Sequence, residues 1–200
     1  MQDKTLKFII AVGIQVSILL FIILIKLSIL SSGTPVYLSI EPVDPRHPFR
    51  GDYLVFRYKN LSKIPYYKYK DLKAFGYDSY NAPYDFEYIS NNKKDKVLKA
   101  GDKVYVVFSL RKTEPYVYSV LSEYPKNLRE GDYVIKGTVK KVSYSYRGKK
   151  KPKDILVTYG IEQYYIPEGT GAGLNLKNAV AKVIIDDKGT PVLKKVFTGK

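Results

Sequence analysis

Two hydrophobic patterns with different periods divide the chain. Residues 8–30 are apolar almost throughout, with Gln15, Ser17 and Lys26 among the few polar positions. A run of this length can cross roughly 30 Å of hydrocarbon as a helix. Lys26 lies near one end of the run, where its stem can bring the amine to the lipid headgroups. We therefore predict one transmembrane helix near the amino terminus.

A cleaved signal peptide is the alternative interpretation of this segment, because small residues at positions 28–33 would suit processing. The apolar core of a signal peptide has about 7 to 15 residues, and this run is longer, which favours an uncleaved anchor. Lys4 and Lys7 precede the helix with Asp3 to offset them, which favours a cytoplasmic amino terminus. We then expect the rest of the chain to lie outside the cytoplasmic membrane.

After residue 33 apolar residues alternate with polar ones, which is typical of β-strands. The predicted strands cover Val36–Glu41, Tyr53–Tyr58, Lys103–Leu110, Tyr116–Leu121, Asp132–Tyr146, Ile155–Ile166, Ala179–Ile185 and Val192–Phe197. Asp187-Lys188-Gly189 is a natural hairpin turn between the last two. The predicted fold is mostly β, an antiparallel barrel or sandwich of about eight strands on a single N-terminal transmembrane helix. Residues 1–33 form the amino-terminal tip, anchor and hinge, and residues 34–200 form the β domain.

The alternation is lost over residues 61–100, where tyrosine and lysine are frequent. We expect a Tyr/Lys-rich surface insertion here, with a short helical turn near Asp71–Phe75. Three Gly-Asp pairs, which begin at positions 51, 101 and 131, each precede a predicted strand. A Gly-Asp turn is a common way to start a strand, and we prefer this interpretation to three copies of a binding site.

Charge and cysteine content narrow the environment of the domain. The sequence has 34 Lys and Arg against 19 Asp and Glu, which gives a formal net charge of +15. A basic domain beside a membrane is attracted to anionic lipid headgroups or wall polymers, whereas an extracytoplasmic location excludes nucleic acid as the partner. The chain has no cysteine and a single histidine, so disulfides, thiolate metal sites and sites that need two imidazoles are excluded. We predict neither a metal nor a cofactor.

The candidate binding residues lie around the turn that precedes Tyr53–Tyr58. Two prolines, at positions 45 and 48, and Gly51 turn the chain here. Arginine presents a planar fork that matches a carboxylate or a phosphate, and neighbouring tyrosines add to the grip on such a group. The candidate site comprises Arg46, His47, Arg50, Asp52, Tyr53, Arg57 and Tyr58. A solvated basic face, or ion pairs of the arginines with Asp44 and Asp52, is the alternative interpretation.

Two segments carry a resemblance to a known family. Gly51-Asp52-Tyr53-Leu54-Val55-Phe56-Arg57-Tyr58 resembles the signature of the GDYXXLXY proteins, with Phe56 where that pattern has leucine. Residues 159–169, which read Tyr-Gly-Ile-Glu-Gln-Tyr-Tyr-Ile-Pro-Glu-Gly, are similar to a later aromatic stretch of the same family. The resemblance covers residues 36–58 and 132–196. It implies a bacterial membrane-anchored protein that accompanies multi-pass membrane proteins and has no established reaction.

We therefore expect a membrane-anchored, non-enzymatic accessory or binding protein of the cell envelope, which docks on a multi-pass membrane protein or on an anionic envelope surface. The alternative is a hydrolase or transferase that acts on an envelope polymer through carboxylates near the Gly-Asp-Tyr turn, with Asp52 and Glu162 as candidates. Convergence of Asp44, His47, Asp52 and Glu162 in one open pocket would favour the enzyme. A carrier of lipid or another small ligand would instead need a wide apolar cavity inside the barrel.

Overall fold

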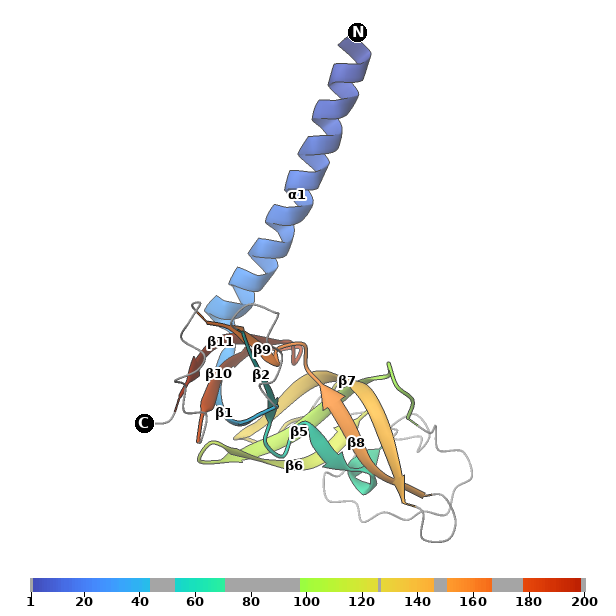
Figure 1. The fold of residues 1–200 in the computed structure, drawn as a ribbon, viewed down its shortest axis with the longest axis vertical. Coiled ribbons are helices and arrows are strands. Elements are labelled where there is room, and N and C mark those ends of the chain that lie inside the picture. The colour runs from blue at the N-terminus through green and yellow to red at the C-terminus, as the bar shows by residue number, and fades with distance from the viewer. Residues whose placement is uncertain are drawn as a thin grey trace.

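The computed structural model describes residues 2–43, 53–70, 98–125, 127–145, 151–166 and 178–198. In this part of the chain one α-helix, α1 (Gln2–Ser32), projects from a β domain (Figure 1). The most apolar stretch of α1 has a mean hydropathy of 3.0, and none of it is buried. Its length and composition therefore allow α1 to cross a membrane, as the sequence predicts.

The strands form two sheets, and the mostly β fold is confirmed. The five-stranded sheet has the order β11-β10-β1-β2-β9 and contains β1 (Thr34–Pro42), β2 (Tyr53–Tyr58), β9 (Gln163–Tyr165), β10 (Val180–Ile185) and β11 (Pro191–Phe197). The six-stranded sheet has the order β3-β8-β7-β5-β6-β4 and contains β3 (Lys63–Pro65), β4 (Tyr69–Lys70), β5 (Lys103–Arg111), β6 (Glu114–Leu121), β7 (Asp132–Ser145) and β8 (Lys151–Thr158). Neighbouring strands pair antiparallel except β4 and β6, which are parallel.

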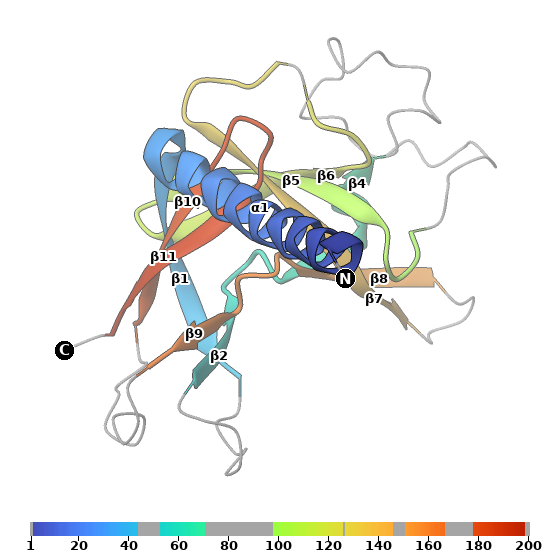
Figure 2. The same ribbon diagram turned by 90° about the horizontal axis from the view of Figure 1, so that it is seen from above.

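One hydrophobic core lies between the two sheets. Its buried side chains come from both of them, for example Val36, Leu38 and Ile40 of β1, Val183 and Ile185 of β10, Val104, Val106 and Phe108 of β5, and Ile135 and Val139 of β7. Figure 2 shows the five-stranded sheet to one side and β5, β6, β7 and β8 to the other. Alternate residues of each strand can therefore point into the core while their neighbours face outward.

Backbone hydrogen bonds also join each sheet to a turn of the other. The amide of Ser39 in β1 donates to the carbonyl of Thr113 in the β5–β6 turn, at 2.9 Å. The amide of Lys136 in β7 donates to the carbonyl of Gly189 in the β10–β11 turn, at 2.7 Å. The predicted hairpin at residues 187–189 is thus confirmed and has a second role, because it fixes one sheet against the other.

The strand count exceeds the eight that the alternation predicts, because β3 and β4 are too short to show a period and because the predicted strand Ile155–Ile166 is two strands, β8 and β9, in different sheets. β3, β4 and β9 have two or three residues each. Two of them, together with the 3₁₀ helix η1 (Tyr66–Lys68), lie in the segment that we expected to be a surface insertion. Residues 61–70 instead belong to the fold, since Leu61 and Ile64 are fully buried. The helical turn expected near Asp71–Phe75 falls outside the described residues.

The Gly-Asp pairs at positions 101 and 131 are turns that start strands, as we interpreted them. Gly101 and Gly131 have φ values of +95° and +85°, which favour glycine. Gly131 directly precedes β7, and Gly101 precedes β5 by two residues. Asp102 accepts a hydrogen bond from the amide of Lys99 at 2.8 Å, which closes its turn. The third pair, Gly51-Asp52, lies outside the described residues.

Replacing Gly137 of β7 by alanine tests the packing of β7 on β8. An added Cβ would lie 2.4 Å from Cγ1 of Val157 and 3.0 Å from Cε1 of Tyr159, both of which are buried. Overpacking of this kind costs about 1–3 kcal/mol. We expect G137A to lower the free energy of unfolding of the detergent-solubilised protein by that amount in urea titrations. Lys141→Ala, an exposed change in the same strand, is the control. Equal stabilities of the two variants would contradict the close approach.

Candidate functional site

Strand β2 (Tyr53–Tyr58) is the described part of the Gly-Asp-Tyr motif that resembles the family signature. Phe56 and Tyr58 are each 1% exposed and point into the core, where their rings meet edge to face with centroids 5.5 Å apart. Arg57 lies between them in the sequence and faces solvent on the other side of the sheet. The motif strand therefore supports the core with one face and offers Arg57 on the other.

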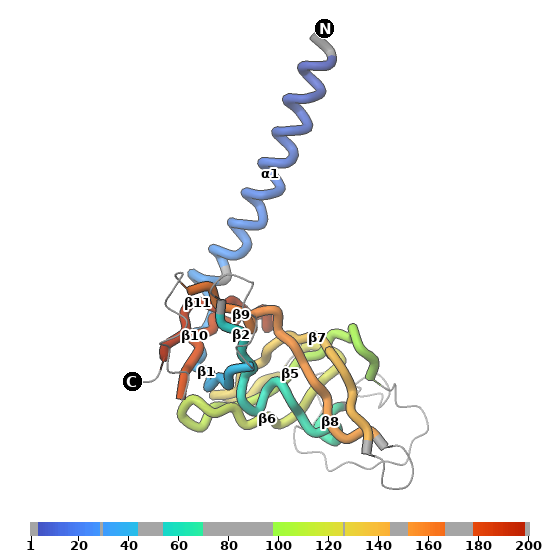
Figure 3. The backbone as a smooth tube through the Cα atoms, in the orientation of Figure 1, coloured from blue at the N-terminus to red at the C-terminus, as the bar shows by residue number. Residues whose placement is uncertain are grey.

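β2 continues into β3, and β8 continues into β9, so that two paired chain segments run from one sheet into the other (Figure 3). Their backbone pairing is interrupted halfway. It ends at Phe56, whose amide donates to the carbonyl of Glu162 at 3.1 Å, and resumes where the amide of Val157 donates to the carbonyl of Ser62 at 3.0 Å. We call the unpaired region between these bonds, residues 57–61 and 158–161, the seam.

Two tyrosines hold the seam together. The hydroxyl of Tyr58 donates to the carbonyl of Ile161 at 2.8 Å, and the hydroxyl of Tyr159 donates to the carbonyl of Leu61 at 2.9 Å. Each ring therefore reaches across to the opposite segment, and the two rings pack edge to face at 6.0 Å. Burial, and secondarily the nearby Glu162 carboxylate, raise the pKa of both hydroxyls well above the ordinary value. Both groups therefore stay protonated and act as donors.

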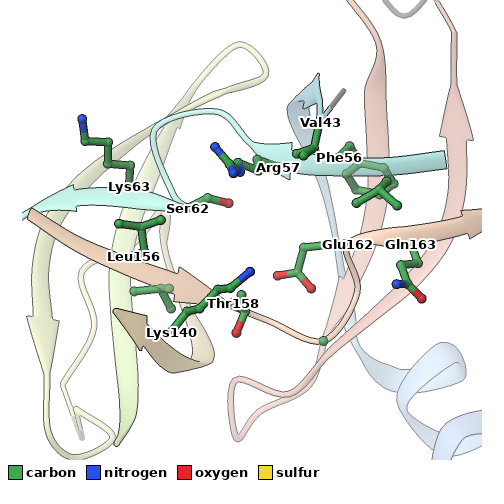
Figure 4. A pocket seen from close by; sticks show the side chains of 13 residues that line it. Val43, Phe56, Arg57, Ser62, Lys63, Lys140, Leu156, Thr158, Glu162 and Gln163 are labelled. Atoms are coloured by element: carbon green, nitrogen blue, oxygen red, sulfur yellow. The ribbon is translucent and has the colours of Figure 1, made fainter. Parts of the chain in front are cut away.

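A cavity of about 470 Å³ lies beside the seam. Its lining includes Arg57, Ser62, Lys140, Leu156, Thr158 and Glu162. In Figure 4 the side chains of Arg57, Lys140 and Glu162 point toward the space between the two segments. Lys63 also belongs to the lining but its amine points away, and it lies 3.5 Å from the carboxylate of Asp154.

The charged groups of the cavity differ in how they are held. Glu162 is fixed, because its Oε1 accepts a hydrogen bond from the amide of Tyr159 at 2.5 Å. Arg57 and Lys140 come from different sheets, and within the described part of the chain no carboxylate oxygen lies within 4.0 Å of either cation. Two cations that have no ion-pair partner in the described part of the chain therefore face the same cavity as one anchored carboxylate. Such a group of side chains can bind an anion. It does not include the pair of carboxylates that the enzyme alternative requires.

The structure places the predicted site residues in different environments. Arg57 lines the cavity, whereas Tyr58 is buried and its hydroxyl is bonded to Ile161. Tyr53 begins β2 and pairs with Tyr165 of β9. Arg46, His47, Arg50 and Asp52 lie outside the described residues. So does Asp44, and the carboxylate pair of the enzyme alternative therefore stays a prediction.

Sequence reasoning missed Lys140, which is the extra residue of a β-bulge. The register of β7 on β8 skips it, since Val139 pairs with Val157 and Lys141 with Leu156. A bulge re-aims the side chain of the extra residue. Consecutive lysines in a strand give no sign of where such a shift occurs, so the sequence carried no signal for this position.

A second surface feature lies on β1, which follows α1, and on β10 and β11, which contact α1. Tyr37 of β1 pairs with Lys182 of β10, and Lys182 pairs with Lys195 of β11. The amine of Lys182 lies 5.4 Å from the centre of the Tyr37 ring, and that of Lys195 lies 5.3 Å from the centre of the Phe197 ring. The Tyr37 and Phe197 rings are 6.3 Å apart and 41% and 42% exposed. We call these four residues the β1–β11 patch.

These features define a class, a two-sheet β domain joined to one helix that is apolar enough to span a membrane. The sequence profile of the GDYXXLXY protein family matches residues 15–196, and the chain belongs to this family. The match spans both segments that carried the resemblance and the stretch between them. Searches of curated proteins and of solved structures gave no match.

The tyrosines of the seam predict a specific response to alkaline pH. Their pKa values are raised in the folded state, so unfolding is favoured increasingly as the pH rises above the ordinary tyrosine value of about 10. At neutral pH, Tyr58→Phe and Tyr159→Phe should each cost about 1–3 kcal/mol, because a buried or partly buried carbonyl loses its donor.

Thermal unfolding of the detergent-solubilised protein between pH 8 and about pH 11 checks this response. The double variant should lose less stability over that range than the wild type. Tyr67→Phe, at a tyrosine that is 64% exposed, is the control and should follow the wild type. A double variant with the same alkaline slope as the wild type would show that these hydroxyls are not the groups responsible.

Proposed function

We propose that this protein is a single-pass, membrane-anchored, non-enzymatic accessory protein of the cell envelope. In this proposal α1 spans the cytoplasmic membrane with its amino terminus in the cytoplasm, and the β domain lies outside. The β1–β11 patch docks on a multi-pass membrane protein in the same membrane.

The short joint between helix and domain is the observation that carries the proposal. α1 ends at Ser32 and β1 begins at Thr34, so Gly33 alone separates them. The helix also contacts β10 and β11, and Figure 1 shows the five-stranded sheet at its base. Tyr37 follows Ser32 by roughly 17 Å of extended chain at most. The patch therefore stays close to the end of α1, within reach of a protein embedded in the same bilayer.

The chemistry of the patch fits an acidic, membrane-proximal loop of such a partner. Tyrosine and phenylalanine supply broad apolar contact, and aromatic residues are enriched in protein interfaces. Lys182 and Lys195 supply positive charge in register with Tyr37. The net charge of +15 adds a general attraction toward anionic groups. An anionic lipid surface would meet the same patch and is the competing occupant.

Charge reversal tests the docking surface. The full-length protein, recovered from its native membrane in a mild detergent, should bring down a multi-pass partner in stoichiometric amount. Lys182→Glu combined with Lys195→Glu should reduce that recovery about tenfold, since repulsion replaces attraction. Lys141→Glu combined with Lys153→Glu, two exposed changes in the six-stranded sheet, make the same change in charge elsewhere and should leave recovery unchanged.

The outcomes of this experiment separate the alternatives. Equal loss in both double variants would show that total charge acts rather than the patch. Recovery of the protein without a partner would refute docking on a protein. Binding of that partner-free protein to anionic vesicles, abolished by the patch variant alone, would assign the patch to lipid.

The orientation is tested independently by cysteine labelling, because the chain has no cysteine of its own. A single cysteine at Lys194, an exposed position of β11, should react with a membrane-impermeant maleimide in intact cells. A single cysteine at Gln2 should react only after the membrane is permeabilised. The reverse pattern would place the β domain in the cytoplasm and overturn the proposed orientation, whatever the result of the docking experiment.

A further inference from the structure

We propose that the seam cavity binds a small hydroxylated anion, a phosphate or carboxylate group that carries a neighbouring hydroxyl, as in glycerol phosphate or a sugar acid. Arg57 and Lys140 hold the anionic group, and Glu162 accepts a hydrogen bond from the hydroxyl. This site is separate from the β1–β11 patch and does not depend on the docking proposal.

The two cations define the anionic end of the ligand. Arg57 reaches the cavity from β2 of one sheet and Lys140 from β7 of the other. Arg57 offers a planar fork and Lys140 a point charge, and both suit phosphate or carboxylate oxygens. Lys140 is aimed by the bulge in β7, and bulges are over-represented next to functional sites.

Glu162 makes the site selective for anions that also carry a hydrogen-bond donor. Its carboxylate is held by the amide of Tyr159 and points into the same cavity as the two cations. A bare anion would be repelled by this group, whereas a ligand hydroxyl or another donor would be bound by it. Thr158 also belongs to the lining, and its hydroxyl donates to the carbonyl of Thr138 at 3.3 Å. The lining thus matches a ligand with an anionic group and a donor within one small molecule.

The cavity is built before any ligand arrives. Asn60 and Gly160, one on each segment of the seam, have φ values of +62° and +74°, so the backbone of each segment leaves the extended conformation within the seam. A non-glycine residue at such a φ is uncommon and such conformations cluster at functional sites. Tyr58 and Tyr159 hold the separated segments at a fixed spacing. The binding groups therefore lie on a preformed frame, which lowers the entropic cost of binding.

The size of the cavity and the charges at its edge favour a small anionic ligand over the lipid that the sequence also left open. A volume of about 470 Å³ falls in the range of small-molecule sites, which is roughly 300–1,000 Å³. The lining combines apolar side chains such as Val55 and Leu156 with the charged Arg57, Lys140 and Glu162. Arg57 and Lys140 are exposed, so the cavity opens at the surface and is not the wide apolar cavity inside the barrel that a lipid carrier would need. The chemistry is shared by a free metabolite, a wall polymer unit and the headgroup of an anionic lipid.

The test is a ³¹P NMR titration of the full-length protein in dodecyl maltoside at physiological ionic strength. The probes are sn-glycerol 3-phosphate and inorganic phosphate, with glycerol as a neutral control followed by ¹H NMR. We expect glycerol phosphate to bind about tenfold more tightly than inorganic phosphate. Its glycerol hydroxyls stand apart from the phosphorus and can reach Glu162 while the phosphate stays on Arg57 and Lys140, whereas the P–OH groups of inorganic phosphate share the phosphorus with the oxygens that bind the cations. Glycerol should not bind detectably.

Three variants assign the effect to residues. Arg57→Gln and Lys140→Gln should each weaken glycerol phosphate binding about tenfold or more. Lys141→Gln, the adjacent lysine outside the lining, is the matched control and should leave binding unchanged. Glu162→Gln keeps a carbonyl oxygen for the amide of Tyr159, and it should narrow the difference between glycerol phosphate and inorganic phosphate. Thermal unfolding confirms that each variant is folded.

Two results would overturn the proposal. One is equal weakening by Lys140→Gln and Lys141→Gln, which would mean that net charge alone attracts the anion. The other is no binding of either phosphate by the folded wild type. If the site binds, competition with phosphatidylglycerol nanodiscs identifies the source. Displacement of glycerol phosphate supports a lipid headgroup, and continued binding supports a soluble or polymer-borne anion.

Discussion

The reciprocal hydrogen bonds of Tyr58 and Tyr159 are the constraint on which the rest of the domain depends. They act where the two sheets join and where the backbone pairing stops, so two carbonyls there would otherwise lose a donor. A buried carbonyl without a donor costs about 1–3 kcal/mol. The two tyrosines belong to the two segments that carried the family resemblance, about a hundred residues apart in the sequence. In the fold these segments pair as β2 and β9, and the two rings meet beyond the end of that pairing.

The seam also explains how a sandwich with a well-packed core can carry a polar cavity. Along β2, Phe56 and Tyr58 fill the interior while Arg57 faces outward, so the same strand serves stability and binding without conflict. On the other strand, Tyr159 is buried while its neighbour Thr158 lines the cavity. Gly137 completes the arrangement, because the absence of its side chain leaves room for Val157 and Tyr159. The interior and the cavity are therefore shaped by the same few residues.

The sequence predicts the features that depend on local pattern. The long apolar helix, the mostly β fold, the Gly-Asp turns at 101 and 131 and the last hairpin all follow from periodicity or turn chemistry. β3 and β4 are too short to show a period, and for that reason residues 61–70 were assigned to the surface. The site was harder to predict. Arg57 is placed by simple alternation, but Lys140 depends on a bulge and the Tyr58–Tyr159 contact on long-range pairing, neither of which has a local signal.

The single-residue joint between α1 and β1 has a mechanical consequence. The apolar run of α1, residues 8–30, has a length of about 34 Å, slightly more than the roughly 30 Å of bilayer hydrocarbon. Such a helix adapts to bilayer thickness by changing its tilt. If α1 spans a bilayer, the single residue at the joint and the contacts of α1 with β10 and β11 would couple the orientation of the β domain to that tilt. The local thickness of the membrane would then influence the height and the orientation of the β domain relative to the lipid surface.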